Sequence, residues 1–304
     1  MHKADTLREE GLSPSSTATP PSAGARASIQ RSFSQPGLEV VLDGATVAGD
    51  GAPIVLSHAL GLDLHMWDSL AHELAIAGHP VMRYDHRGHG ASAVPIGPYS
   101  MADLVDDAAR LVLEWGRGPI VWVGLSMGGM VGQGLAIEHP QLVQALVIAN
   151  STSRYPEAAR TMWANRIATV EAKGLASIAD AVIERYFAPH FRATQPQVTE
   201  IFRSQVLRTD PTGYAACCHA VAGVDFLDRL HKVRCPTLVI AGAQDVGAPV
   251  AMSEAIASRV PGAELAIFDD AAHLSVVEQP ALFAKELRRF VGTLSMGDTF
   301  TPTR

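Results

Sequence analysis

A serine stands between two glycines in the segment GLSMG at residues 124–128. A G-x-S-x-G segment that follows a buried strand and opens a helix makes a sharp turn, which needs glycine at its flanks and exposes the serine hydroxyl. The flanking residues suit this arrangement, since Ile120–Val123 is a short apolar run and a Gly- and Ala-rich helical segment follows it as far as His139. We therefore predict that Ser126 is a nucleophile at a helix N-terminus, where developing negative charge is favoured.

A serine hydroxyl needs a base to act as a nucleophile at neutral pH. The chain has 12 histidines, so position must decide among them. His273, in DDAAHLSVVEQP, follows the last expected strand, where the loops of a parallel sheet converge, and we predict that it is the base. His86 and His89, in RYDHRGHGAS, are expected to be structural, in a loop held to the sheet edge through Asp85 and Arg87. The pattern H-x-x-H alone is too weak to indicate a metal site.

An acid should orient the histidine and stabilise its charged form. Asp245 follows the apolar run TLVIAG and completes the chain order Ser126, Asp245, His273. Residues 269–270 are also acidic but stand too near His273 in the chain, so we expect them to cap the loop. The position after the strand that ends at Ala149 is Asn150, which offers no rival acid.

Attack on a carbonyl also requires N–H donors for the oxyanion. The backbone of Met127, directly after the nucleophile, is the first expected donor. The second is expected from the loop after IVLS, where Leu60 is our candidate. His58 and Gly61 are then expected to shape that turn, His58 as a loop hydrogen-bonding residue.

These residues must be positioned by an alternation of strands and helices. Apolar runs with flanking helical segments predict an α/β fold with a mostly parallel, doubly wound sheet covered on both faces. Residues 151–230 carry helical periodicity without strands, which predicts a helical cap inserted between two parts of the core, 37–150 and 231–295. Residues 1–36, rich in Ser, Pro and Ala, are expected to be a disordered tail, and 296–304 a C-terminal tail.

Composition narrows the possible partners. The chain has 304 residues, 47% hydrophobic and 18% charged, with a net charge of -7 and a sequence pI near 5.9. Unclustered basic residues in an acidic chain argue against a nucleic-acid partner, and no apolar run is long enough to span a membrane. The three cysteines, Cys217, Cys218 and Cys235, have no zinc spacing, and a reducing, cytoplasmic setting is expected.

From about Leu38 to Val291 the chain resembles the α/β-hydrolase fold, and more closely the 3-oxoadipate enol-lactonase family. The resemblance is carried by LGLDLHMWDSL, RYDHRGHGAS, GLSMGGM, the segment DPTGYAACCHA and AAHLSVVEQP in the same order. It implies a serine hydrolase that opens a carboxylated enol lactone to 3-oxoadipate, with Ser126, Asp245 and His273 as its triad and no cofactor or metal. His58 in SHALG, VGAPV after Asp245 and the long N-terminal segment depart from the family pattern.

A buried substrate carboxylate requires a cationic partner, and arginine suits its two oxygens. Arg154 and Arg166 are the candidates, with neither preferred, and Trp67 and Trp163 are expected either to line the pocket or to pack in the core or cap. Another small-ester esterase of this fold, including the cofactor-free haloperoxidase type, remains an alternative. So does a binding protein that has lost catalysis, while the oligomeric state stays open.

Overall fold

The computed structural model describes residues 29–33, 37–43 and 51–294. Its backbone forms an eight-stranded sheet in the order β1-β2-β4-β3-β5-β6-β7-β8. The strands are β1 (Ile29–Phe33), β2 (Leu38–Asp43), β3 (Ile54–Ser57), β4 (Val81–Tyr84), β5 (Ile120–Leu125), β6 (Val143–Ala149), β7 (Thr237–Gly242) and β8 (Glu264–Phe268). The β1–β2 and β2–β4 pairs are antiparallel, and every other pair is parallel.

The central strands are covered on both faces, which confirms the predicted fold class. Every residue of β3, β4, β5 and β7 is buried, as continuous apolar strands of a parallel sheet require. The core of the described residues forms two clusters: one contains residues of α2 and α3, and the other contains residues of α1 and α11. Their bounds are α1 (Asp68–Ile76), α2 (Met101–Trp115), α3 (Met127–Glu138) and α11 (Pro280–Leu294).

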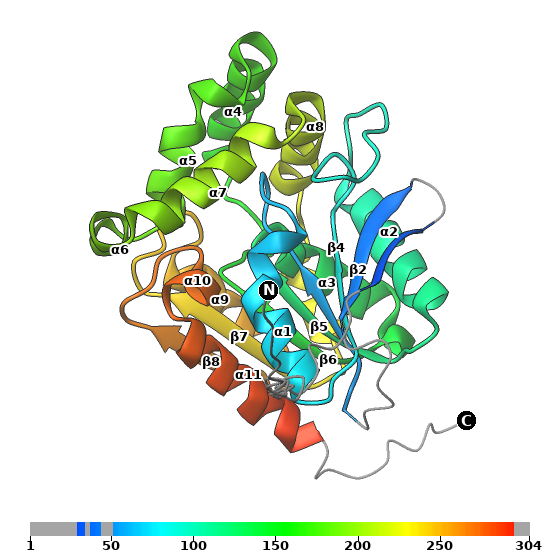
Figure 1. Ribbon diagram of the computed structural model, residues 1–304. Coiled ribbons are helices and arrows are strands. Elements are labelled where there is room, and N and C mark those ends of the chain that lie inside the picture. Colours follow the sequence, from blue (N-terminus) through cyan, green and yellow to red (C-terminus); the bar gives the residue numbers. More distant parts are fainter. Residues whose placement is uncertain (1–28, 34–36, 44–50, 295–304) are drawn as a thin grey trace, which may run out of the picture.

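Five α-helices occupy the chain between β6 and β7, in the stretch where a helical cap is expected. They are α4 (Ala159–Lys173), α5 (Ala179–Tyr186), α6 (Pro189–Thr194), α7 (Pro196–Arg208) and α8 (Pro211–Ala222). Figure 1 shows them gathered at one end of the sheet, above the loops that leave its strands. The chain then returns through β7, α9 (Val250–Ala257), β8 and the short α10 (Ser275–Glu278) to α11.

Local signals in the sequence explain several helix ends. The hydroxyl oxygen of Ser100 accepts a hydrogen bond from Asp103 N at 3.2 Å, and the Asp103 carboxylate accepts one from Ser100 N at 2.8 Å. This reciprocal cap starts α2 at Met101. Gly116 ends the helix in the left-handed conformation with φ 68°, which glycine adopts without steric cost.

The structure differs from the sequence prediction at the N-terminal end. Residues 29–33, expected in a disordered tail, form strand β1, which pairs with β2 along its whole length. The rest of that predicted tail, residues 1–28 and 34–36, and the predicted tail at 296–304 lie outside the described residues. A 3-10 turn at Leu64–Trp67 directly precedes α1.

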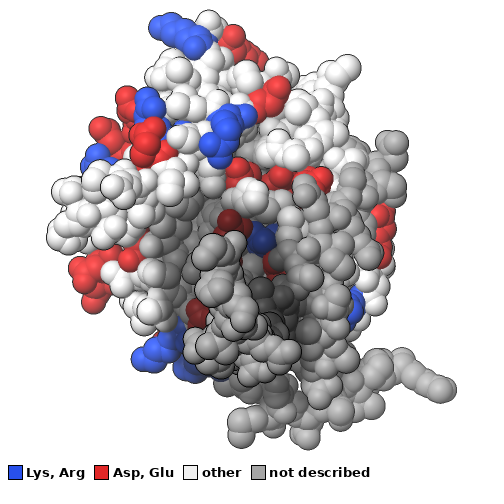
Figure 2. Space-filling model, in the orientation of Figure 1, with Lys and Arg blue, Asp and Glu red and all other residues white. Residues whose placement is uncertain are grey.

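Charges are interspersed over the surface of the cap. Figure 2 shows acidic and basic side chains close to one another there, and several form ion pairs, such as Arg203 with Asp180 at 2.7 Å. In the described part of the chain, no helix combines the length and the apolar character that a membrane span requires.

Candidate active site

Ser126 lies at the turn between β5 and α3, in a conformation that few non-glycine residues adopt. Its backbone angles are φ 56° and ψ -113°. A Cβ atom on Gly124 would lie 2.1 Å from Gly128 O, and one on Gly128 would lie 2.2 Å from Ser57 O. Side chains are therefore excluded on both sides of the serine, which is the close approach that the G-x-S-x-G spacing predicts.

The turn is held by its backbone. Ser126 N donates to Ala149 O at 2.9 Å, at the end of the neighbouring strand β6, and Ser126 O accepts from Met130 N at 3.0 Å and Ser151 Oγ at 2.8 Å. Met127 is the first residue of α3, so its N–H has no acceptor within the helix. Met127 N–H directly follows Ser126 in the chain, which is the position expected of one oxyanion donor.

His273 and Asp245 come from the loops that follow β8 and β7, and their side chains meet. His273 Nδ1 lies 2.7 Å from Asp245 Oδ2, with 7% and 0% of the two side chains exposed. The other carboxylate oxygen accepts hydrogen bonds from Gly247 N at 2.7 Å and Ala248 N at 2.9 Å. Asp245 is therefore fixed as an acceptor, and this is the contact by which an acid orients a histidine base.

Asn150 adds a contact that the sequence analysis missed. Its Nδ2 donates to Asp245 Oδ2 at 3.2 Å and to Ala272 O at 2.9 Å, and its Oδ1 accepts from Ser275 Oγ at 2.5 Å. Asn150 has φ 48°, a left-handed conformation that asparagine tolerates better than most residues. It links the end of β6 to the Asp245 side chain and to the His273 loop. The available signal was a polar residue directly after an apolar strand.

The loop after β3 contains Leu60, the second expected donor. His58 Nδ1 donates to Ala59 O at 2.8 Å, and Leu62 N donates to the same oxygen at 3.2 Å. In a planar trans peptide the C=O and the N–H point in opposite directions, so the N–H of Leu60 points away from both of these groups. The turn thus orients Leu60 N–H through its backbone, whatever the side chain.

His58 in this loop and His86 and His89 in the loop after β4 are buried next to one another. His58 Nε2 accepts from His86 N at 2.9 Å, and His89 Nε2 accepts from Gly61 N at 2.9 Å. Burial lowers the pKa of His58 and His86 well below the ordinary value and that of His89 to about 4. All three therefore act as neutral hydrogen-bonding residues, the structural role expected from the sequence.

The loop that carries His86 and His89 is anchored at the two residues named for this role. Asp85 accepts from Leu64 N at 2.7 Å and from Ala91 N at 2.9 Å. Arg87 Nε and Nη2 donate to both oxygens of Asp107 on α2, at 2.6 and 2.7 Å. Within the described residues, no group of three or more His, Cys, Asp or Glu side chains is arranged to hold a metal ion.

The four residues predicted to bind substrate lie in different surroundings. Arg154 pairs with Asp225 at 2.5 Å and with Asp228 at 2.7 Å, so its charge is already compensated. Trp67 has no exposed surface and packs against Phe283, which corrects the expectation that it could line a pocket: it is a core residue.

Arg166 and Trp163 lie together in the cap. The guanidinium of Arg166 stands 5.2 Å over the Trp163 ring and donates to Tyr214 Oη at 3.4 Å. Among the ion pairs of the described residues, none includes Arg166. Within the part of the chain that the structure describes, the Arg166 guanidinium therefore has no carboxylate partner, whereas that of Arg154 has two.

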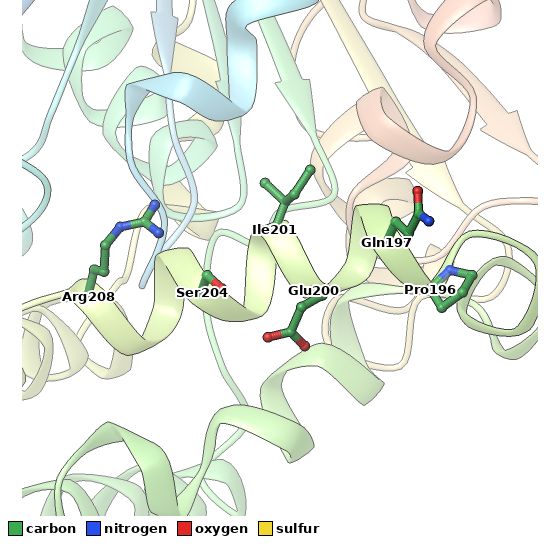
Figure 3. Close-up of a pocket in the computed structure, with 6 residues that line it drawn as sticks. All are labelled: Pro196, Gln197, Glu200, Ile201, Ser204 and Arg208. Atoms are coloured by element: carbon green, nitrogen blue, oxygen red, sulfur yellow. The ribbon is translucent and has the colours of Figure 1, made fainter.

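Two surface cavities of the described residues lie away from the triad, since neither is lined by Ser126, Asp245 or His273. A depression of about 570 Å³ lies on α7, and Figure 3 shows its lining side chains, all from that helix. A second cavity, of about 460 Å³, lies between α7, β2 and the loops around Asp63 and Asp85.

Comparison with known proteins agrees with this architecture. Residues 52–280 match the family model described as the alpha/beta hydrolase fold. The chain is 34% identical over 248 residues to 3-oxoadipate enol-lactonase 2 of Acinetobacter baylyi, covering 81% of this chain and 91% of that protein. It is 30% identical over 251 residues to a putative carbamate hydrolase RutD of Azorhizobium caulinodans, covering 82% and 94%.

A solved structure shows the same likeness. The enol-lactonase from Burkholderia xenovorans LB400 superposes with a TM-score of 0.82 and 31% identity, covering 87% of this chain and 100% of that one. Together with the fold and the loop geometry, these matches show that the chain belongs to the α/β-hydrolase family, within the group of sequences that includes the 3-oxoadipate enol-lactonases.

Proposed function

We propose that the protein hydrolyses 3-oxoadipate enol-lactone to 3-oxoadipate, a step of the β-ketoadipate pathway of aromatic catabolism, in the cytoplasm. The observation that carries this proposal is the hydrogen bond of 2.7 Å between Asp245 and His273, at the sheet edge from which the strained turn presents Ser126. The similarity to enol-lactonases supports the choice of substrate, and the similarity to RutD proteins makes a carbamate the competing one.

In the proposed mechanism, Ser126 Oγ attacks the lactone carbonyl while His273 takes the hydroxyl proton. Asp245 keeps the imidazole oriented and stabilises its charged form, and the N–H groups of Leu60 and Met127 bind the oxyanion. When the intermediate collapses, the bond to the ring oxygen breaks and an enolate leaves, which takes the proton from His273 and becomes the ketone. A water molecule activated by His273 then releases the acid from Ser126, and no cofactor or metal is needed.

Arg166 is the proposed partner of the carboxylate that the lactone carries. A planar guanidinium can bind both carboxylate oxygens, and its position over Trp163 on α4 places it in the cap. Arg154 cannot take this role without giving up Asp225 and Asp228. Arg154 therefore provides a matched control for Arg166.

The test compares the enol-lactone with an otherwise identical lactone in which the carboxylate is a neutral amide. Wild type should prefer the carboxylated lactone. Arg166→Gln should reduce that preference in kcat/KM about 10- to 100-fold, the range for losing a charged hydrogen bond, whereas Arg154→Gln should leave it within about twofold. Equal rates on the two lactones, or faster hydrolysis of a small carbamate, would reject the proposed substrate. An absence of turnover on all of them, with binding retained, would indicate a binding protein.

A further inference from the structure

Tyr186 is the last residue of α5, and it joins the cap to two catalytic loops at once. Its hydroxyl donates to Leu60 O at 2.5 Å, which is a short but ordinary O–H···O distance. Its ring stacks on the imidazole of His273, with centroids 5.1 Å apart and planes inclined by 22°. Its own carbonyl oxygen accepts from Leu274 N at 3.0 Å.

The contact with Leu60 fixes one particular peptide plane. Leu60 O and Gly61 N belong to the same peptide: the oxygen accepts from Tyr186, and the N–H donates to His89 Nε2 at 2.9 Å. The two groups therefore hold this plane from opposite sides. Gly61 has φ 75°, and glycine allows such a peptide to rotate at little steric cost. Without the phenol, one of the two restraints on the turn is lost.

A neighbouring contact secures the same strip of cap. Glu278 accepts from Ala272 N at 2.8 Å and from Ala188 N at 2.9 Å, so its carboxylate connects the residue before His273 to the residue two after Tyr186. Burial raises the pKa of the Tyr186 phenol, which keeps it protonated and able to donate. Residues 186–188 thus form a fixed attachment of the cap to the His273 loop.

On the basis of the serine hydrolase function proposed above, we propose that Tyr186 is a positioning residue, whose hydroxyl aligns the Leu60 turn for the oxyanion while its ring holds the plane of His273. The hydroxyl acts through the Leu60–Gly61 peptide and has no role in proton transfer. Because the oxyanion forms only during reaction, its misalignment lowers kcat and leaves KM nearly unchanged. If Tyr186 only stabilised the fold, its substitution would lower stability without a selective loss of kcat.

Tyr186→Phe is the informative variant, because it keeps the ring and removes only the hydroxyl. Loss of a whole oxyanion donor costs about 100- to 1,000-fold in kcat, so a donor that is only misaligned should cost about 10-fold. The matched control is Tyr99→Phe, since the Tyr99 hydroxyl donates to the backbone oxygen of Pro95 at 2.6 Å in a separate loop. Both variants should lose similar thermal stability, and only Tyr186→Phe should lose activity.

Two readouts separate this inference from the choice of substrate. The first is kcat and KM on the enol-lactone. The second is the rate of p-nitrophenol release from p-nitrophenyl acetate, which reports acylation of Ser126 with a generic ester. A wild type that acts on the ester but not on the lactone would reject the proposed substrate and leave the Tyr186 comparison valid.

The expected result is a roughly 10-fold slower acylation in Tyr186→Phe with KM within about twofold, and a further loss in Tyr186→Leu, which also removes the stack. Acylation within twofold of wild type in Tyr186→Phe would overturn the inference. An equal loss in Tyr99→Phe, or a change confined to KM, would also overturn it. So would a wild-type protein in which p-nitrophenyl acetate does not acylate Ser126.

Discussion

Acidification should weaken the fold through His89, whose imidazole is buried between the Leu60 turn and the cap. Burial lowers the pKa of His89 to about 4, whereas a histidine in the unfolded chain titrates near 6.5. The unfolded state therefore binds a proton in a pH range where the folded state does not. The stability that His89 contributes is complete above pH 6.5 and is lost as the pH falls toward 4. Between pH 7 and pH 5 this single group should reduce the free energy of unfolding by about 2 kcal/mol.

His89→Gln tests this magnitude. A glutamine can accept from Gly61 N and donate to Arg87 O, the two backbone contacts of the His89 ring, but it does not titrate. Asp85 acts in the opposite direction, since burial raises its pKa to about 6 and its contribution is lost as the pH rises through that value. It is present in both proteins, so its effect cancels in the comparison.

The assay is urea unfolding of both proteins at pH 7 and pH 5. The fall in unfolding free energy between the two pH values should be about 2 kcal/mol larger in wild type than in His89→Gln. His72→Gln, on the exposed face of α1, is the control and should match wild type within about 0.5 kcal/mol. An equal fall in wild type and His89→Gln would refute the reasoning that His89 is held neutral by burial.

Two further variants probe the turn and the acid. Gly128→Ala should prevent correct folding of the turn and abolish activity, because its Cβ would lie 2.2 Å from Ser57 O; circular dichroism and turnover would check this, and an active, stable variant would contradict it. Asn150→Ala should destabilise the protein by about 1–3 kcal/mol and lower kcat, since Ser275 and Ala272 O lose a partner and Asp245 loses a restraint. Unchanged melting temperature and kcat would show that Asn150 is dispensable.

Local patterns in the sequence were sufficient for most of the elements. The capping pair Ser100 and Asp103, the apolar run at 120–123 and the glycines at 124 and 128 act over short separations, so each can be identified without knowing the fold. Strand β1 escaped prediction because Ile29–Phe33 is a short segment in a Ser- and Pro-rich stretch, and its order comes from backbone pairing with β2.

The contacts that hold the candidate site together could not be predicted in the same way. Asn150 and Asp245 are 95 residues apart, and Tyr186 and Leu60 are 126 apart, so only the folded sheet and cap bring them together. Neither residue type is unusual at its position: the asparagine follows a strand, and the tyrosine ends an amphipathic helix. Likewise, only the ion pairs of Arg154 with Asp225 and Asp228 distinguish it from Arg166.

The most direct test of the account asks whether Ser126 is a nucleophile activated by His273. The protein is treated with a fluorophosphonate, which phosphonylates activated serines, and its peptides are then analysed by mass spectrometry. We expect one equivalent of label on Ser126, labelling slower by at least about 100-fold in His273→Ala, and none in Ser126→Ala. Label on another residue, or a labelling rate of Ser126 that does not change in His273→Ala, would contradict the account.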